Sequence, residues 1–412
     1  MRRLIWTGIG VVLVCAWVGC SDAPTAEAPV VEAVTDEEPV SSGATTVVDS
    51  GASKGDVLLA ALVEAAEDND PLPVAKDEKD KKKVEVARVA QEAVDLTEAL
   101  KASALRARVD GNGKPIVLDF HGRYLTDEGL AKLKGQTTLQ QLFLSQQEGI
   151  TDIGLEHLKG LTALRTLHLA ETPIGDSNLE ALATLKALQE LDLSGTKISS
   201  AGLEHIKSLT ALIELDLSRS PVTDSGLVHL KPLTKLQRLD LANTEVGSAG
   251  LESLAGLKLV ELHLDGTRVD DAGLIHLRSM TSLRQLVLSA GIGDKGLESL
   301  KPLTGLVRLD VGGSATISDV GIEHLKSLTA LQRLDLSGTG VTDSGLLSVK
   351  GLGNLQRLNL ARTRITDSGL RHLRALSNLR ELDLTGTKMR PGALRQLQAA
   401  LPNCHIVGSS DG

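Results

Sequence analysis

Six histidines recur at the same place in a repeated segment of the chain, and a regular series of imidazoles could bind a transition metal. They are His157, His205, His229, His276, His324 and His372. A zinc site needs further nitrogen, sulfur or carboxylate ligands at a fixed spacing from each of them. The segments supply no such ligand at a constant spacing, and several segments lack the histidine. We interpret the series as half-buried helix residues copied by duplication, and we expect neither a metal ion nor any other cofactor.

Nucleophilic catalysis and phosphate binding are no better supported by the residue pattern. Serine, histidine and aspartate occur in nearly every segment, so spacing distinguishes no single triad. No glycine-rich phosphate loop follows an expected strand, and the three cysteines do not cluster. We therefore expect a protein that is not an enzyme.

Charged residues beside alternating leucines are the more informative candidate site. In the segment Leu239-Asp240-Leu241 both leucines point to one face of a short strand, so Asp240 points to the other. Like charges about 5 Å apart repel by around 1 kcal/mol in water, which favours a cation or a basic partner. The candidate partner-binding residues are Glu190, Asp192, Glu214, Asp216, Arg238, Asp240, Glu261, His263 and Asp265. The alternative is that Leu-Asp-Leu is simply the ordinary sequence of the repeat.

The segment from Val287 to Ser314 interrupts this pattern. The aspartate series fails there, the loop at 289–291 is one residue short, and the loop at 312–315 is one residue long. Irregular loops on a regular scaffold often carry binding residues. Random decay of one repeat would produce the same irregularity, so both interpretations stay open.

The elements that must position these residues are twelve copies of one unit. The first apolar residue of each Leu-x-Leu core lies at 118, 142, 167, 191, 215, 239, 262, 286, 309, 334, 358 and 382. Such a period is typical of a solenoid, whose units bury their leucines only against neighbouring units.

Over residues 115–406 the chain resembles the leucine-rich repeat family. It is most similar to the 24-residue Thr-Asp-x-Gly-Leu-x-His-Leu type of bacterial lipoproteins, which is related to the cysteine-containing repeats. The resemblance implies an α/β fold, a right-handed horseshoe solenoid with about 12 parallel strands on its concave face. It says almost nothing about the ligand; the solenoid and its charged concave face are what lead us to expect a protein partner.

Within one unit, each recurrent polar residue has an expected structural role. Thr223 should cap the helical half of its unit, with Asp224 in the positive first turn. Gly226 should allow close approach of the backbone. A short hydroxyl such as Thr196, where many relatives carry asparagine or cysteine, should bond to neighbouring backbone.

The amino terminus has the pattern of an export signal. Two arginines precede the apolar residues 4–18, a stretch shorter than the ~20 residues of a membrane-spanning helix. Residues 16–21, AWVGCS, resemble the lipobox of bacterial lipoproteins. The resemblance implies that the signal peptide, residues 1–19, is removed and that Cys20 carries the acyl chains that anchor the protein. An uncleaved membrane anchor is the alternative.

Residues 20–83 are expected to be a lipid-anchored, disordered acidic linker. Twelve acidic residues and one lysine lie within 21–70, whereas 71–412 is electrically neutral in a chain of net charge −9. A neutral body without a basic field is a poor ligand for phosphate backbones, so we expect no nucleic-acid partner. Only 1% of residues are aromatic, so the core must be almost purely aliphatic.

Two caps should close the ends of the solenoid. Residues 84–114 form an expected N-terminal capping helix and hairpin, with a turn at Asp110-Gly111-Asn112-Gly113. The repeat domain with its C-terminal cap then occupies 115–412. Cys404, in an apolar alternation near the end, should be a small buried hydrophobe.

Together these patterns predict a monomeric, non-enzymatic, membrane-tethered scaffold that binds protein on its concave face. We expect it to be exported, as a lipoprotein of the bacterial cell envelope that faces the periplasm or lies in the outer membrane. Two alternatives are a structural envelope protein without a specific partner and a substrate receptor like F-box leucine-rich repeat proteins. The second alternative requires an F-box helix bundle, which residues 21–114 do not supply.

Overall fold

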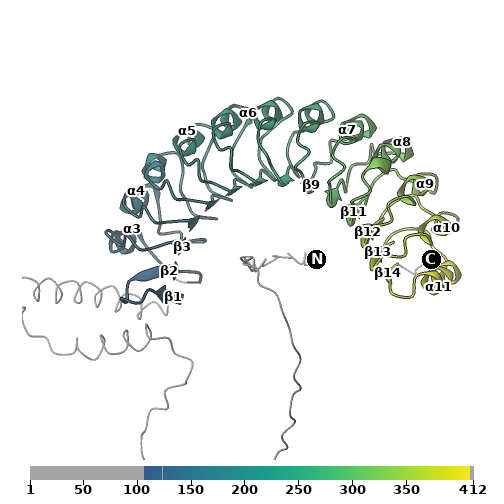
Figure 1. Cartoon of the computed structure of the whole chain (residues 1–412), viewed down its shortest axis with the longest axis horizontal. Coiled ribbons are helices and arrows are strands. Elements are labelled where there is room, and N and C mark those ends of the chain that lie inside the picture. Colours follow the sequence, from purple (N-terminus) through teal and green to yellow (C-terminus); the bar gives the residue numbers. More distant parts are fainter. Residues whose placement is uncertain (1–105, 123, 409–412) are drawn as a thin grey trace, which may run out of the picture. The chain divides into compact units, whose positions relative to one another are not determined.

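A computed structural model describes residues 106–122 and 124–408 of the chain. The predicted signal peptide, the acidic linker and the capping helix within 84–104 lie outside these residues. The described part forms a curved stack of repeats, with strands along the inner, concave side and short helices along the outer side (Figure 1).

One sheet of 14 strands runs the length of the stack in sequence order. Its strands are β1 (Arg106–Val109), β2 (Pro115–Asp119), β3 (Gln141–Phe143), β4 (Thr166–His168), β5 (Glu190–Asp192), β6 (Glu214–Asp216), β7 (Arg238–Asp240), β8 (Glu261–His263), β9 (Gln285–Val287), β10 (Arg308–Asp310), β11 (Arg333–Asp335), β12 (Arg357–Asn359), β13 (Glu381–Asp383) and β14 (His405–Val407). The first pair, β1 and β2, is antiparallel and forms the predicted hairpin. All later pairs are parallel.

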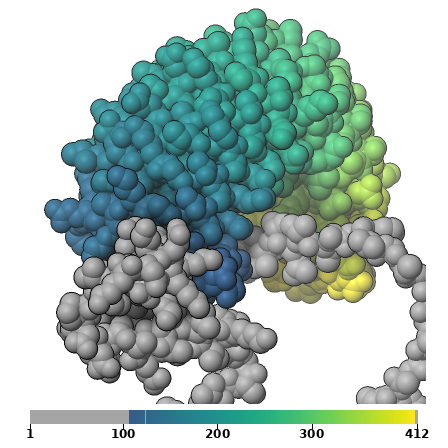
Figure 2. All heavy atoms as spheres, turned by 60° about the vertical axis from the view of Figure 1, so that its left-hand side comes forward, coloured from purple at the N-terminus to yellow at the C-terminus, as the bar shows by residue number. Residues whose placement is uncertain are grey.

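The helical side consists of single turns of α-helix or 3₁₀-helix. The α-helices are α3 (Asp127–Ala131), α4 (Asp152–Leu155), α5 (Leu203–Ile206), α6 (Asp224–Leu227), α7 (Asp294–Glu298), α8 (Asp319–Glu323), α9 (Leu346–Val349), α10 (Leu370–Leu373) and α11 (Pro391–Ala400). The 3₁₀-helices are η1 (Glu156–Leu158), η2 (Leu179–Thr184), η3 (Val228–Leu230), η4 (Gly250–Leu254), η5 (Gly273–Leu277) and η6 (His324–Ser327). In the space-filling view, the colours follow one another in sequence order over the surface, as a stack of neighbours requires (Figure 2).

The core between strands and helices is aliphatic, as the composition predicts. Leu191, Leu193 and Leu203 of one unit are all fully buried, and the equivalent residues of the other units are buried as well. Phe120 is the one aromatic side chain in this core among the described residues. Each buried leucine stabilises the fold by about 1.5–3 kcal/mol. An isolated unit would leave these leucines exposed, so the fold depends on contacts between neighbouring units.

The expected hydroxyl position is confirmed. Thr196 Oγ donates to the carbonyl of Leu193 at 2.6 Å, and Thr172 and Thr244 make the same bond to the residue three positions earlier. These hydroxyls are buried, so the bond satisfies a polar group that would otherwise be costly to bury.

Thr223 occupies the N-cap position of α6 with Asp224 in the first turn, as predicted, but its hydroxyl makes no capping hydrogen bond, whereas those of the equivalent Thr151 and Ser318 do. The Thr223 hydroxyl instead lies 2.9 Å from the hydroxyl of Ser200, in the unit before it. Asp224 likewise reaches the next unit, where its carboxylate accepts the backbone N–H of Gly247 at 2.5 Å. The polar residues at the helix start therefore join neighbouring units.

The C-terminal end differs from the expectation by one strand. The parallel series contains thirteen strands, β2 to β14, because Ile406 pairs with Leu382 in register. Helix α11 and the residue that follows it cover this end, with Leu397 and Leu401 in the core. Cys404 is buried there as predicted, and burial raises the pKa of its thiol.

Candidate functional site

The concave face presents two columns of side chains, one on each side of the central leucine of every strand. The strand register aligns Glu190 with Glu214 and Asp192 with Asp216, and the same alignment continues along the sheet. The first column reads Gln141, Thr166, Glu190, Glu214, Arg238, Glu261, Gln285, Arg308, Arg333, Arg357, Glu381 and His405. The second reads Phe143, His168, Asp192, Asp216, Asp240, His263, Val287, Asp310, Asp335, Asn359, Asp383 and Val407.

The aspartates of the second column have a structural role. Asp192, Asp216 and Asp240 each accept, through Oδ1, the backbone N–H of the residue two positions later, at 2.8–2.9 Å. Such a side-chain turn ends the strand and turns the chain toward the helical side. One carboxylate oxygen is thus used by the fold, and Oδ2 is left for other contacts.

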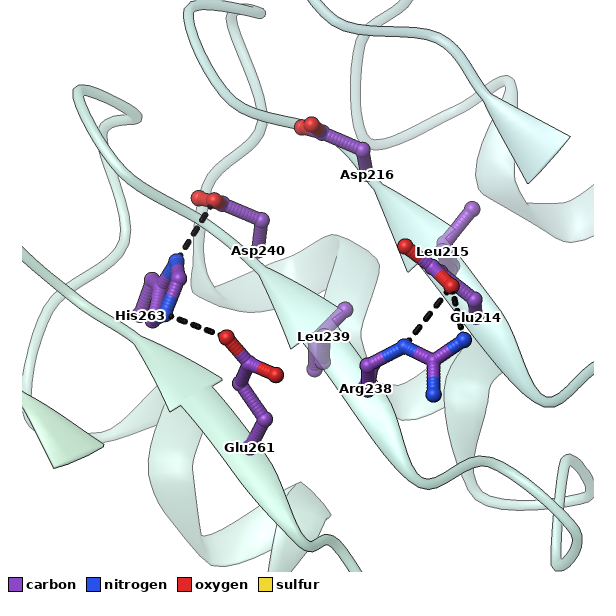
Figure 3. A pocket seen from close by; sticks show the side chains of 8 residues that line it. All are labelled: Glu214, Leu215, Asp216, Arg238, Leu239, Asp240, Glu261 and His263. Atoms are coloured by element: carbon purple, nitrogen blue, oxygen red, sulfur yellow. Dashed lines mark hydrogen bonds and ion pairs between the residues drawn. The ribbon is translucent and has the colours of Figure 1, made fainter. Parts of the chain in front are cut away.

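A shallow pocket of about 90 Å³ opens on the concave face across β6, β7 and β8 (Figure 3). It is lined by Glu214, Leu215, Asp216, Arg238, Leu239, Asp240, Glu261 and His263. Six of the nine predicted partner-binding residues therefore meet at one place. Of the others, Glu190 and Asp192 lie on the neighbouring strand β5, and Asp265 lies two residues beyond His263.

Within the pocket most charges are paired across strands. The Arg238 guanidinium donates to Glu214 Oε2, from Nε at 2.7 Å and from a terminal nitrogen (Figure 3). This pairing raises the pKa of Arg238. His263 lies between two carboxylates, with Nδ1 2.8 Å from Asp240 Oδ2 and Nε2 2.9 Å from Glu261 Oε1. The second contact is an ion pair without hydrogen-bond alignment.

The charge of His263 follows from this arrangement. Burial opposes the charged imidazole, but the hydrogen bond with Asp240 and the contact with Glu261 outweigh it and raise its pKa to about 10. His263 is thus a cation at neutral pH. The same contact lowers the pKa of Glu261, so this pair stays ionised.

Asp216 is the uncompensated group of the pocket. It forms no ion pair with any described residue, and its register neighbours are Asp192 and Asp240. Burial and the charges of these aspartates raise the pKa of Asp216 to about 6. A cationic group placed beside it would remove this electrostatic cost.

Two residues on β3 and β4, beyond β5 from the pocket, were not predicted as part of the site. His168 Nε2 lies 2.7 Å from Glu190 Oε1, and its ring packs edge-on against Phe143 at 4.8 Å between centroids. The contact with Glu190 raises the pKa of His168 against the effect of burial. The sequence carried a signal for it, since His168 occupies a column in which aspartate is the most frequent residue.

The irregular loops around β9 remain within the stack. Ser289 Oγ donates to the carbonyl of Val269 at 2.8 Å, and Ser314 Oγ donates to the carbonyl of Ser289 at 3.2 Å. Both hydroxyls are buried, and Val287 is almost fully covered. The missing and extra residues are thus accommodated by hydrogen bonds between units.

The other candidate positions named from the sequence, the recurrent histidines and Cys20, do not add to the pocket. Among residues 106–122 and 124–408, no group of three histidine, cysteine or acidic side chains is arranged to hold a metal ion. The recurrent histidines are half-buried on the helical side. The same part of the chain has no helix long and apolar enough to cross a membrane. Cys20 lies outside the described residues.

Comparisons with known proteins define the class of this chain. A profile described as "Leucine rich repeat" matches residues 137–198 and 329–389, and a second with the same description matches 233–255. With the repeat-stacked sheet, these matches establish that the chain is a leucine-rich repeat protein. No curated protein matches the sequence.

One solved structure shows the same fold, and a second is similar over much of the chain. An internalin (inlF) from Listeria monocytogenes is 24% identical, with a TM-score of 0.55, over 71% of this chain and 86% of that one. A leucine-rich repeat protein of Leptospira interrogans is 19% identical, with a TM-score of 0.49, over 69% of this chain and 74% of that one.

Proposed function

We propose that this protein is a non-enzymatic scaffold that binds a partner protein in the pocket across β6–β8. The observation that carries the proposal is Asp216, a half-buried carboxylate between two further aspartates that no described cation compensates. Natural interfaces use such charges to attract and orient a complementary partner. A basic side chain of the partner, seated beside Asp216, is the expected contact.

Site-specific photo-crosslinking in cells tests this assignment. A photoreactive residue at Asp192, beside the pocket, should capture a defined protein, whereas the same residue at Ile275 on η5 should not. Ile275 is a suitable control because it is exposed on the helical side. Asp216→Lys should abolish the capture, and Glu252→Lys on the exposed side of η4 should leave it intact.

The outcomes separate the alternatives. Equal capture from both positions, or capture that survives Asp216→Lys, would overturn the site. No capture from either position would favour a structural envelope protein without a specific partner.

We further propose that the scaffold is held at a membrane of the bacterial envelope by acyl chains on Cys20. The support is the AWVGCS segment and the acidic residues that follow it. Several acyl chains anchor a folded domain stably, whereas a single one binds reversibly. The intact mass of membrane-extracted protein should lack residues 1–19 and include fatty acyl groups; a mass that retains residues 1–19 would exclude the proposal.

A further inference from the structure

Three arginines lie in register on the concave face, beyond the irregular unit at β9. Arg308, Arg333 and Arg357 occupy the first column of β10, β11 and β12, and the register places each directly beside the next. Neighbouring parallel strands lie about 4.8 Å apart. Like charges at this distance repel, by around 1 kcal/mol in water and more near a protein surface. We name these three residues the arginine row.

The fold does not require arginine in this column. In the pocket upstream, Arg238 lies between Glu214 and Glu261, so its charge is balanced by its neighbours. It forms a two-bond ion pair with Glu214. The arginine row lacks this alternation, and its middle member has an arginine on each side.

The carboxylate nearest to Arg333 along its strand is already bonded to other groups. Asp335, on the same strand, accepts the Ser337 N–H at Oδ1 and the Asn359 amide at Oδ2, each at 2.8 Å. Both oxygens are therefore occupied. In the part of the chain that the structure describes, Arg333 forms no ion pair, although its side chain is exposed.

The flanking arginines are only partly compensated. Arg308 lies 3.8 Å from Asp310, at the limit of an ion pair, and Arg357 lies 2.9 Å from Glu381. Both pairs are at least one-quarter exposed to solvent, so each guanidinium retains free donors. A guanidinium presents five donors in a planar fork, which suits a carboxylate of a second molecule.

We propose that the arginine row binds an acidic segment of the partner polypeptide. This inference rests on the proposed function and adds a second contact, five strands from Asp216 at Arg333. A partner with basic residues at one end and acidic residues at the other would thus be oriented along the concave face. Its acidic segment needs several carboxylates on one side, as alternate residues of an extended peptide supply.

A peptide fits this surface better than a polyphosphate chain. Asp310 and Asp335 lie in the second column, directly beside the arginine row. A continuous polyanion would meet these carboxylates, whereas a peptide can place neutral or basic side chains over them. The alternating rows of opposite charge therefore favour discrete carboxylates.

Binding of a labelled (Ser-Glu)₄ peptide to the full-length protein tests the inference. At low salt, fluorescence anisotropy should detect saturable binding, with (Ser-Gln)₄ as the uncharged control. Arg333→Glu should weaken binding by about tenfold or more, as expected for loss of a charged hydrogen-bonded contact. Arg371→Glu, on the exposed side of α10, should leave it unchanged, which separates the row from general basic charge.

Each other outcome has a defined meaning. Equal loss with Arg333→Glu and Arg371→Glu, or tighter binding of a single-stranded oligonucleotide than of the acidic peptide, would overturn the inference. If the peptide fails to bind while Asp192 still captures a partner, the arginine row is excluded and the proposed function stands. If capture also fails, the proposed function itself is wrong.

Discussion

At the scale of single residues, the concave face combines compensated and uncompensated charges of the same type. Asp240 and Asp216 are neighbours with the same backbone hydrogen bond, yet only Asp240 has a cation, His263. The difference lies in the adjacent strands, because Asp240 has His263 beside it on β8, whereas Asp216 has an aspartate on each side. An uncompensated group that weakens the fold is a candidate for binding, since its cost is offset only when a partner arrives.

Asp216→Asn should stabilise the protein and weaken partner capture. The folded pKa of Asp216, about 6, exceeds its ordinary value of 3.8, so the folded state binds more protons across this window. Stability contributed by the protonated form is therefore lost as the pH rises from about 4 to 6. Asparagine keeps the acceptor for Ser218 N–H, so we expect a gain of about 1–3 kcal/mol at pH 7 and none below pH 4.

Chemical denaturation at pH 3.5 and pH 7 measures this difference, with Glu252→Gln on the exposed side of η4 as the control. A loss of stability at pH 7 would show that Asp216 is a structural residue. Equal partner capture by Asp216→Asn and the native protein would remove its role in binding.

At the scale of elements, the start of each helical turn is fastened to the next unit. The Asp319 carboxylate accepts the backbone N–H of Thr342 at 2.8 Å and its hydroxyl at 2.6 Å. Asp127 and Asp294 make the same pair of bonds to the following units. The Thr-Asp-x-Gly motif thus connects neighbouring units, and its glycine leaves room for the aspartate of the unit before it.

Gly345→Ala should destabilise the protein although alanine favours helix. A methyl group there would lie 2.5 Å from Asp319 Oδ1 and 2.8 Å from a γ-carbon of Val341, so the inter-unit bonds must shift. We expect a loss of about 1–3 kcal/mol, the usual cost of overpacking. Thermal or urea unfolding measures it.

Gly351→Ala is the matched control, because no atom lies within 4 Å of a methyl group at that position. It should be neutral within about 0.5 kcal/mol or slightly stabilising. If both variants behave alike, steric contact with Asp319 is not the reason for the conserved motif position within this chain's repeats.

At the scale of the whole solenoid, the free energy of unfolding is approximately a sum of contacts between neighbouring units. A terminal unit has only one neighbour, so a cap must cover its other face. The buried residues form one continuous cluster from Leu118 to Cys404. Helix α11 and strand β14 close this cluster at the C-terminal end. An uncovered end would expose the apolar surface that the last unit normally buries.

Removal of residues 391–412 should therefore lower the thermal midpoint and promote self-association. The deletion exposes Leu382 and Leu384, which are buried under the cap in the native protein. Calorimetry and light scattering measure the two effects, with removal of residues 409–412 alone as the control. A truncated protein that stays monomeric with an unchanged midpoint would show that the cap is dispensable.

The repeat period and the period-two alternation were enough to predict a stacked solenoid and the two exposed columns, and the resemblance to the leucine-rich repeat family supplied the horseshoe fold. Leucines spaced by 23–25 residues can be buried only by stacking, and a strand puts alternate residues on opposite faces. The hairpin at 106–119 and the burial of Cys404 followed from equally local patterns. The last strand was missed because His405-Ile406-Val407 lacks the paired leucines that marked the other units.

Only the tertiary structure decided which charges neutralise one another. Arg238 has glutamates on both sides but pairs with Glu214, and His263 reaches back to Asp240 while contacting Glu261. The Thr223 hydroxyl makes no capping bond to the backbone of its own helix and contacts the hydroxyls of Ser200, in the unit before it, and Ser225. Sequence periodicity determines which column a side chain occupies. The partner it contacts depends on distances of about 3 Å between side-chain atoms, which only side-chain conformation and packing set.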